Sequence, residues 1–146
     1  EPHKLSGCRW YIDGFTQQAP SPYTCLVAVP LSDQSLPWTG NFVAFPGSHM
    51  TLQEHVREAV GSRNLDLRNE LDLSKPDLGE PVQVIMQPGS AIIAHQKLAM
   101  RGGPNYGPHI RYMVYFRVQH VDHAQLQQFV LDSPWVEFEG LADLVN

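Results

Sequence analysis

The chain alternates between short apolar runs and clusters of proline and glycine. The runs are rich in Val, Ile, Tyr and Phe, which is typical of β-strands, and the punctuating residues indicate turns. This pattern predicts strands at 8–12, 23–31, 41–49, 81–86, 90–95 and 109–118. The run at 23–31 is apolar almost throughout, which predicts a strand covered on both faces. The Pro-Gly pair within 87–90 predicts a tight turn.

Few segments carry a helical pattern. Met50–Val60 is predicted to be a helix, because Ser48 or Thr51 can cap its start and Gly61 follows its end. A second, short helix is predicted at 122–132, and the charged segment 62–80 is interpreted as a weak helix or an ordered surface loop. Many short strands, few helices and no internal repeat favour a mainly β fold of the sandwich or jelly-roll type. A parallel α/β fold would need helices between most strands.

The strand predicted at 109–118 has two different faces, because side chains alternate along a strand. One face is apolar throughout: Ile110, Tyr112, Val114, Phe116 and Val118. The other face carries Arg111, Met113, Tyr115 and Arg117. We expect the apolar face to be covered by another helix, sheet or chain. An arginine on the inward face needs an anion, so Arg111 either meets a ligand or pairs with a neighbouring carboxylate at the strand edge.

Composition narrows the function classes. The 146 residues fit one domain with a real core. The net charge of −5 and the ten scattered Lys and Arg residues argue against nucleic acid and anionic membranes as partners. No apolar run approaches the length of a membrane span, so we expect a soluble chain. The sequence does not indicate its cellular compartment. Cys8 and Cys25 form a disulfide in a secreted chain or are two separate buried thiols, and we favour the thiols.

Four segments are more informative together than alone. RWYIDGF, GNFVAFPGSH, PGSAIIAHQKLAMRGGPN and PHIRYMVYFRV follow one another in this order. Their order and spacing resemble the phytanoyl-CoA dioxygenase family of iron(II)/2-oxoglutarate oxygenases, and the SPWVEFEGL tail is similar to the end of that family's domain. The resemblance implies a double-stranded β-helix, a cupin-like jelly roll with a few short helices. It implies one domain over 1–146, with the core at about 9–118 and a C-terminal helix and tail at 119–146.

The resemblance also implies a missing N-terminal extension and a second chain that covers the exposed apolar face. Family members usually carry further elements before their first metal motif, whereas only about ten residues precede Tyr11 here. We therefore expect a domain that lacks the usual N-terminal extension. A second copy of the chain or a partner chain is then expected to cover the face of Ile110, Tyr112, Val114 and Phe116.

The family's site residues map onto this sequence as follows. Iron in the family is held by a His-x-Asp motif and a later histidine, and an arginine of the last core strand binds the distal carboxylate of 2-oxoglutarate. Here the aspartate is Asp13 and the arginine is Arg111, with Tyr115 beside it. The two histidine positions hold Tyr11 and Met100, the latter eleven residues before Arg111. Asp13 is thus a vestigial metal ligand.

The remaining histidines are poor substitutes for the missing ligands. His95 lies an odd number of residues before Met100, which turns it to the other face of a strand. His109 lies at the start of the strand predicted at 109–118, and His3 precedes the motif of Tyr11 and Asp13. The others are interpreted as surface or turn residues: His49, His55, His120 and His123.

Three hypotheses for function stay open. In the first, the domain has no oxygenase activity and no cofactor, and serves as a binding or structural module. Arg111 and Tyr115 then hold a small carboxylate in the barrel, or Asp13 pairs with Arg111 or Arg9 in a purely structural interior. In the second, the chain is an active, divergent dioxygenase that uses iron(II) and 2-oxoglutarate. In the third, a tyrosine phenolate and a methionine thioether serve an unusual metal or chromophore protein.

Overall fold

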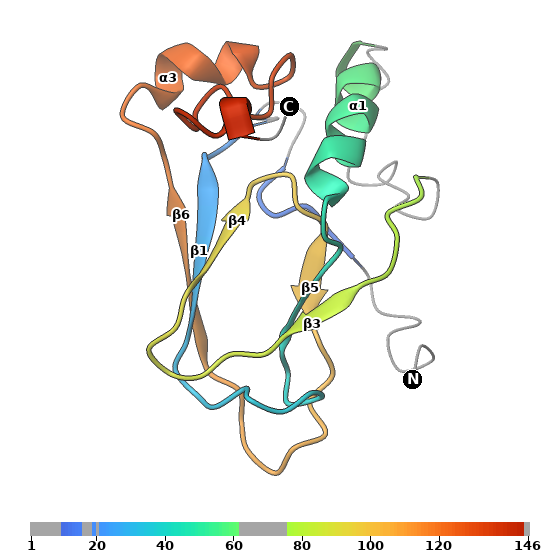
Figure 1. Ribbon diagram of the computed structural model, residues 1–146, viewed down its shortest axis with the longest axis vertical. Coiled ribbons are helices and arrows are strands. Elements are labelled where there is room, and N and C mark those ends of the chain that lie inside the picture. Colours follow the sequence, from blue (N-terminus) through green and yellow to red (C-terminus); the bar gives the residue numbers. More distant parts are fainter. Residues whose placement is uncertain (1–9, 16–18, 20, 62–75, 145–146) are drawn as a thin grey trace.

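Two three-stranded antiparallel sheets form the body of the protein (Figure 1). The computed structural model describes residues 10–15, 19, 21–61 and 76–144. The first sheet has the order β4-β1-β6 and the second the order β3-β2-β5. The strands are β1 (Cys25–Pro30), β2 (Phe42–Ala44), β3 (Val82–Val84), β4 (Ile92–His95), β5 (Met100–Gly102) and β6 (Met113–Val118). The mainly β fold with few helices is therefore confirmed.

The later strands alternate between the two sheets along the chain. β3 pairs with β2, β4 with β1, β5 with β2 and β6 with β1, all antiparallel. The predicted tight turn is present, because the Ser90 N–H donates to the Gln87 oxygen at 3.1 Å and Gly89 has φ +94°. The turn does not close a hairpin, since the strands on either side of it belong to different sheets.

The register of β1 with β6 defines an inner and an outer face. Leu26 lies opposite Arg117 and Ala28 opposite Tyr115 on the inner face, whereas Val27 lies opposite Phe116 on the outer face. Along β1, buried residues alternate with half-buried ones. The prediction that both faces of this strand are covered is therefore wrong within the described residues. An apolar strand composition does not reveal whether a second layer exists.

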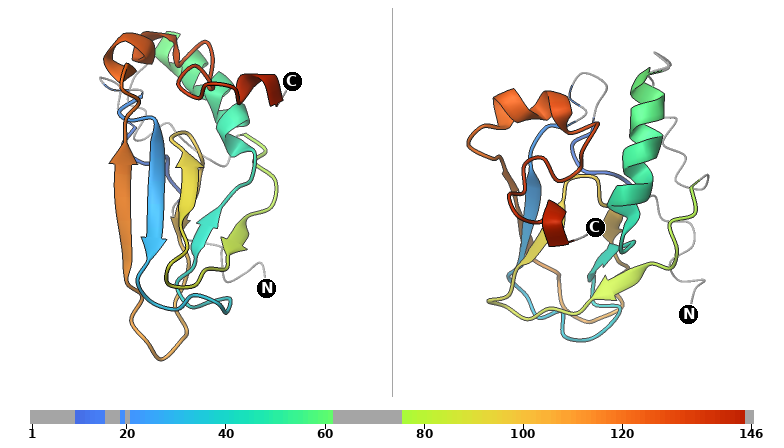
Figure 2. Two further views of the ribbon diagram at one scale, coloured as in Figure 1. Left: turned by 60° about the vertical axis from the view of Figure 1, so that its left-hand side comes forward. Right: turned by 45° about the horizontal axis from the view of Figure 1, so that its top comes forward.

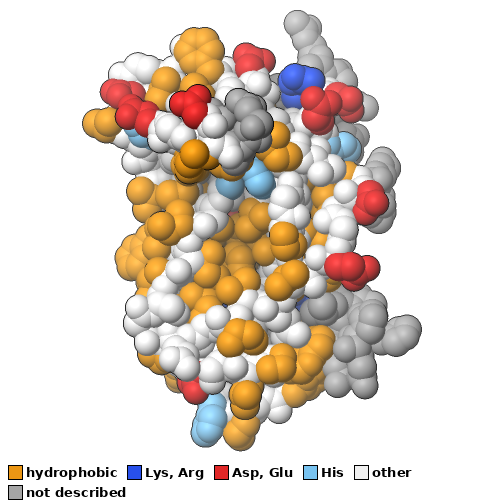
Figure 3. Space-filling model, in the orientation of Figure 1, with side chains coloured by type: hydrophobic (Ala, Val, Ile, Leu, Met, Phe, Trp, Pro, Cys, Tyr) orange, Lys and Arg blue, Asp and Glu red, His pale blue; other side chains and the backbone are white. Residues whose placement is uncertain are grey.

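Two apolar clusters form the core. One fills the space between the sheets and consists of Tyr23, Leu26, Ala28, Phe42, Ala44, Ala94 and Met100. The other lies beneath the long helix and consists of Ile12, Phe15, Leu52, Val56, Leu78 and Ala99. In the view of Figure 3, hydrophobic side chains gather along the middle of the molecule and the charged ones lie near its margins. Among the described residues, the buried charged side chains include Lys97, Arg101 and Glu137.

Helices and the C-terminal segment close one end of the two sheets (Figures 1 and 2). α1 (Ser48–Gly61) begins two residues before its predicted start. The second predicted helix is shorter than expected and consists of α3 (His123–Leu126) followed by the 3₁₀ turn η2 (Gln127–Phe129), and a last 3₁₀ turn, η3, spans Ala142–Leu144. No helix among the described residues has the length and apolar character needed to cross a membrane.

A buried lysine ties the C-terminal segment to α1. Lys97, in the connection between β4 and β5, is fully buried. Its Nζ donates to Gln53 Oε1 and to the Val130 carbonyl, the latter at 3.0 Å. Gln53 Nε2 donates to the carbonyls of Val130 at 2.7 Å and Leu131 at 2.6 Å. Burial lowers the pKa of Lys97 to about 8, and the carboxylate of Glu137 opposes that shift.

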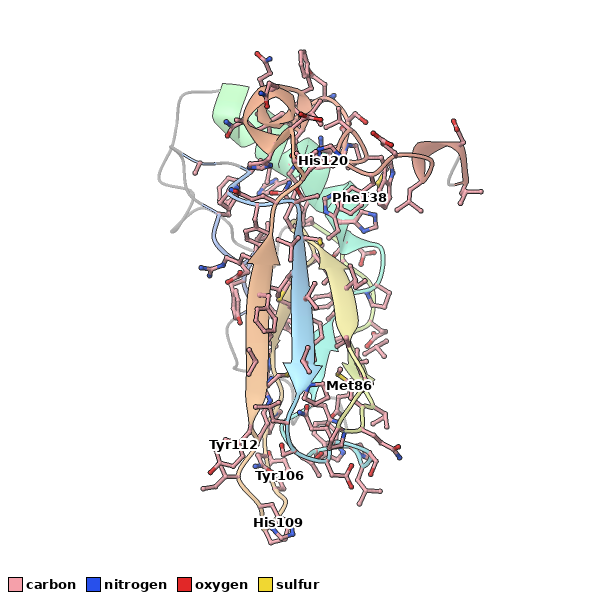
Figure 4. The ribbon with its side chains drawn as sticks, turned by 90° about the vertical axis from the view of Figure 1, so that its left-hand side faces the viewer. Met86, Tyr106, His109, Tyr112, His120 and Phe138 are labelled. Carbon is pink, nitrogen blue, oxygen red and sulfur yellow. The ribbon has the colours of Figure 1, made fainter. Side chains whose placement is uncertain are left out.

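The aromatic side chains of the C-terminal tail pack against the body of the protein. Trp135 and Phe138 stack on His95, with ring centroids 5.6 Å and 5.5 Å away, and Trp135 also contacts His49 at 5.0 Å. Figure 4 shows Phe138 at the end of the sheet where the C-terminal segment lies. Ring packing and the polar anchor at Lys97 thus hold the same segment.

Candidate functional site

Tyr11 and Met100, which occupy the two positions where the family has histidines, lie directly opposite each other. Tyr11 and Met100 form an isolated antiparallel bridge, in which the Tyr11 N–H donates to the Met100 oxygen at 3.2 Å and the Met100 N–H to the Tyr11 oxygen at 3.0 Å. Directly opposed residues in such a pair project their side chains to the same face. The expected first strand is reduced to this bridge within the described residues, and Cys8 and Arg9 lie outside them.

A cavity of about 460 Å³ adjoins this bridge. It is lined by Tyr11, Asp13, Leu26, Met100, Tyr115 and Arg117. All three residues at the predicted triad positions therefore lie around one space, together with Tyr115. Arg111 is not among the lining residues. Its Nη2, however, donates to the hydroxyl of Tyr115, which is a lining residue. The volume is within the range of small-molecule pockets.

Asp13 is fully engaged by its neighbours. Arg117 Nε donates to Asp13 Oδ2 at 2.8 Å, and Arg117 Nη2 donates to Oδ1 at 2.9 Å. The Tyr23 hydroxyl donates to Oδ2 at 3.0 Å. The hydrogen bonds from Arg117 hold the pKa of Asp13 below its ordinary value, while the pKa of Tyr23 is raised by burial and by that carboxylate. The partner of Asp13 is thus Arg117, not Arg111.

The donor set at this position does not fit iron(II). Burial, followed by the nearby Tyr115 and Asp13, raises the pKa of Tyr11, which keeps it a neutral phenol. Met100 offers a soft thioether, whereas iron(II) prefers imidazole and carboxylate. Both oxygens of Asp13 are already bound by a guanidinium. Among the described residues, no group of three or more His, Cys, Asp or Glu side chains gathers at one place.

The guanidinium of Arg111 has N–H donors that form no hydrogen bond within the described residues. Its Nη2 donates to the Tyr115 hydroxyl and to Met113 Sδ, and its Nε is buried with no hydrogen-bond partner among the described residues. No carboxylate in the described part of the chain lies within ion-pair distance of it. The alternative that Arg111 pairs with a neighbouring carboxylate is therefore wrong within those residues. A half-buried guanidinium with spare donors is suited to an incoming anion.

Gly40 leaves room for the Arg111 side chain, whereas Gly102 only borders it. A Cβ added at Gly40 would lie 2.9 Å from Arg111 Cδ, and one added at Gly102 would lie 3.8 Å from Arg111 Nη1. Gly40 also has φ +81°, which L-residues rarely adopt. The sequence does not show this dependence, because Gly40 and Arg111 are far apart along the chain.

We expect Gly40→Ala to displace the guanidinium of Arg111. Gly79→Ala is the matched control, because Gly79 has φ +71° with no atom within 4 Å of an added Cβ. Both variants should lose about 1 kcal/mol of folding stability from backbone strain. Only Gly40→Ala should also weaken anion binding, by roughly tenfold for one lost charged hydrogen bond. Calorimetric titration with a dicarboxylate checks this, and equal affinities in the two variants would contradict it.

The other histidines lie away from the cavity. His95 Nε2 donates to the Pro134 carbonyl at 2.9 Å, and its pKa is lowered to about 4 by burial. His109 is exposed at the end of the loop before β6 (Figure 4). His49, interpreted as a surface or turn residue, is half-buried against Trp135 near the start of α1. His3 lies outside the described residues.

Sequence reasoning missed a buried hydrogen bond and a cavity residue. His123, interpreted as a surface or turn residue, is buried and bonds Glu137 through Nδ1. Arg117 was assigned only to the inward face of its strand, although it is the partner of Asp13. The one available signal was the two-residue alternation, which places Arg117 on the face of Arg111 and Tyr115.

Comparison of the chain with protein-family models, with curated proteins and with solved structures finds no match.

Proposed function

We propose that the chain is a jelly-roll domain of the phytanoyl-CoA dioxygenase type that binds a small carboxylate without metal and has no oxygenase activity. The alternation of β3 to β6 between two antiparallel sheets supports the jelly-roll part of the proposal. The meeting of Tyr11, Met100 and Asp13 around one cavity supports the placement of the site. Their chemistry supports the loss of the metal.

The ion pair of Asp13 with Arg117 is the observation that carries the proposal. A divalent cation at Asp13 would have to displace a guanidinium that already binds both carboxylate oxygens. It would then find a phenol and a thioether where imidazoles are needed. The arrangement already supplies a positive charge, so the interior needs no metal to balance Asp13.

The ligand class follows from the groups left over. Arg111 lies next to the cavity wall, where its Nη2 donates to the hydroxyl of Tyr115. Tyr11 and Tyr115 bring hydroxyls, and both of these tyrosines are partly exposed at the cavity. Guanidinium and hydroxyl donors together favour a carboxylate, which accepts several hydrogen bonds on two oxygens. The cavity volume of about 460 Å³ limits the ligand to a small molecule.

Titration with 2-oxoglutarate or succinate in the presence of a chelator tests this proposal. The wild-type protein should bind, and Arg111→Leu should weaken binding by at least roughly tenfold, the loss expected for a charge-assisted hydrogen bond. Arg57→Leu serves as the matched control, because Arg57 is an exposed helix residue that forms an ion pair with Glu54, away from the cavity. No binding by the wild type, or equal binding by both variants, would refute the ligand assignment.

A further inference from the structure

The outer face of the β4-β1-β6 sheet is a continuous apolar surface. We call it the outer apolar face and define it by Cys25, Val27, Val29, Ile93, Val114, Phe116 and Val118. Tyr112 continues it just before β6, where the Leu31 N–H donates to the Tyr112 oxygen at 2.9 Å. Ile93 is 73 % exposed, Phe116 54 % and Tyr112 58 %. In Figures 2 and 4 no described helix or strand lies in front of this face. Such a surface on a folded domain marks an interaction site.

The face carries no charged side chain. The charged residues of β6 and its approach, Arg111 and Arg117, belong to the opposite, inward face. Two copies stacked through this surface therefore bring no like charges together and leave no charged group unpaired. A face without charges also offers nothing that would select an acidic or a basic partner.

The exposed area is enough for a weak pair of copies. Large aliphatic and aromatic side chains present roughly 150–250 Å² each, so the exposed fractions of Ile93, Phe116, Val118 and Tyr112 amount to on the order of 400–500 Å². Two copies would together bury on the order of 1,000 Å², which is in the range of weak, transient interfaces. Sheets of identical twist can stack face to face at about 10 Å.

We propose that the outer apolar face is the contact between two copies of this chain, which associate sheet on sheet as a symmetric dimer with a dissociation constant on the order of micromolar. The pairing covers Val27 and the neighbouring Phe116 and Ile93 with the same residues of the other copy. It leaves the cavity open, because Tyr11, Tyr115 and Arg117 lie on the inner side of the sheet. The proposal is thus independent of the ligand.

Analytical ultracentrifugation over a wide range of protein concentration tests this inference. The wild type should shift from monomer to dimer through the micromolar range. Ile93→Lys should raise the dissociation constant at least tenfold, because the lysine occurs twice and is buried without an anion. Val82→Lys is the matched control, since Val82 is an apolar residue on an edge strand of the other sheet and is 47 % exposed. It should leave association unchanged within twofold.

A second measurement uses Cys25, a free, half-buried thiol on the same face. In a Cys8→Ser background, alkylation of Cys25 should slow at least threefold as the protein concentration rises through the dissociation constant, and Ile93→Lys should abolish that slowing. A wild type that stays monomeric at all concentrations would overturn the proposal. So would the finding that a different protein, rather than a second copy of this chain, covers the outer apolar face. Equal association by Ile93→Lys and Val82→Lys would also overturn it, provided that both melt as folded proteins.

Discussion

A variant with histidine at Tyr11 and Met100 will bind cobalt(II) only weakly until Arg117 is replaced as well. The two histidines restore imidazole donors at directly opposed positions. Asp13, however, stays bound to Arg117 through both of its oxygens. Adding Arg117→Gln frees the carboxylate, and we expect the triple variant to bind the metal at least roughly tenfold more tightly than the double variant, since bonds to charged groups contribute about 1.5–3 kcal/mol.

Cobalt(II) titration followed by visible absorption measures this difference. Arg57→Gln added to the double variant is the control for a lost positive charge at a distant, exposed position. Thermal unfolding of each variant is needed because Met100 is buried in the core between the sheets. If the triple variant folds but binds no more tightly than the double variant, Arg117 is not what blocks the metal. If neither binds, Tyr11 and Met100 are misplaced as triad positions.

The second large effect concerns Lys97 and pH. The pKa of this lysine is lowered to about 8 by burial, from an ordinary 10.5. Below pH 8 the lysine is protonated in both the folded and unfolded states. Between about pH 8 and 10.5 only the unfolded state binds the proton, so the free energy of unfolding rises with pH, by up to about 3 kcal/mol.

Lys97→Met removes this titration while keeping a long side chain in the buried site. Urea unfolding at a series of pH values should show the wild type gaining stability relative to Lys97→Met between pH 7 and pH 10. Tyr23 and Cys25, whose pKa values are raised by burial, oppose the trend in both proteins and cancel in the difference. Parallel stability curves for the two proteins would show that Lys97 is not held in a lowered-pKa environment.

Much of the fold was predictable because β-strands leave a two-residue pattern. In β6 the alternation alone separates Phe116 on the outer face from Tyr115 and Arg117 on the inner face, as the register with β1 confirms. The same reasoning failed for β1, because an unbroken apolar run looks identical whether one or both of its faces are covered. The extent of α3 was also overestimated, since the pattern at 122–132 does not distinguish a helix from successive 3₁₀ turns.

The site was predictable only in part, because its contacts join distant segments. Motif order led to Tyr11, Asp13 and Met100 as one group, and the structure brings them together around one cavity. The bond between Asp13 and Arg117 spans 104 positions of the chain, and no local sequence pattern indicates such a pair. The anchoring of Lys97 by Gln53 and Val130 is invisible for the same reason.

The affinity for 2-oxoglutarate with and without iron(II) tests the central claim most directly. The titration is made anaerobically on wild-type protein, once with a chelator and once with equimolar iron(II). A metal-free carboxylate pocket predicts the same dissociation constant in both, within about twofold, and no iron retained after gel filtration. Binding that tightens tenfold or more with iron(II), together with stoichiometric retained iron, would contradict the account.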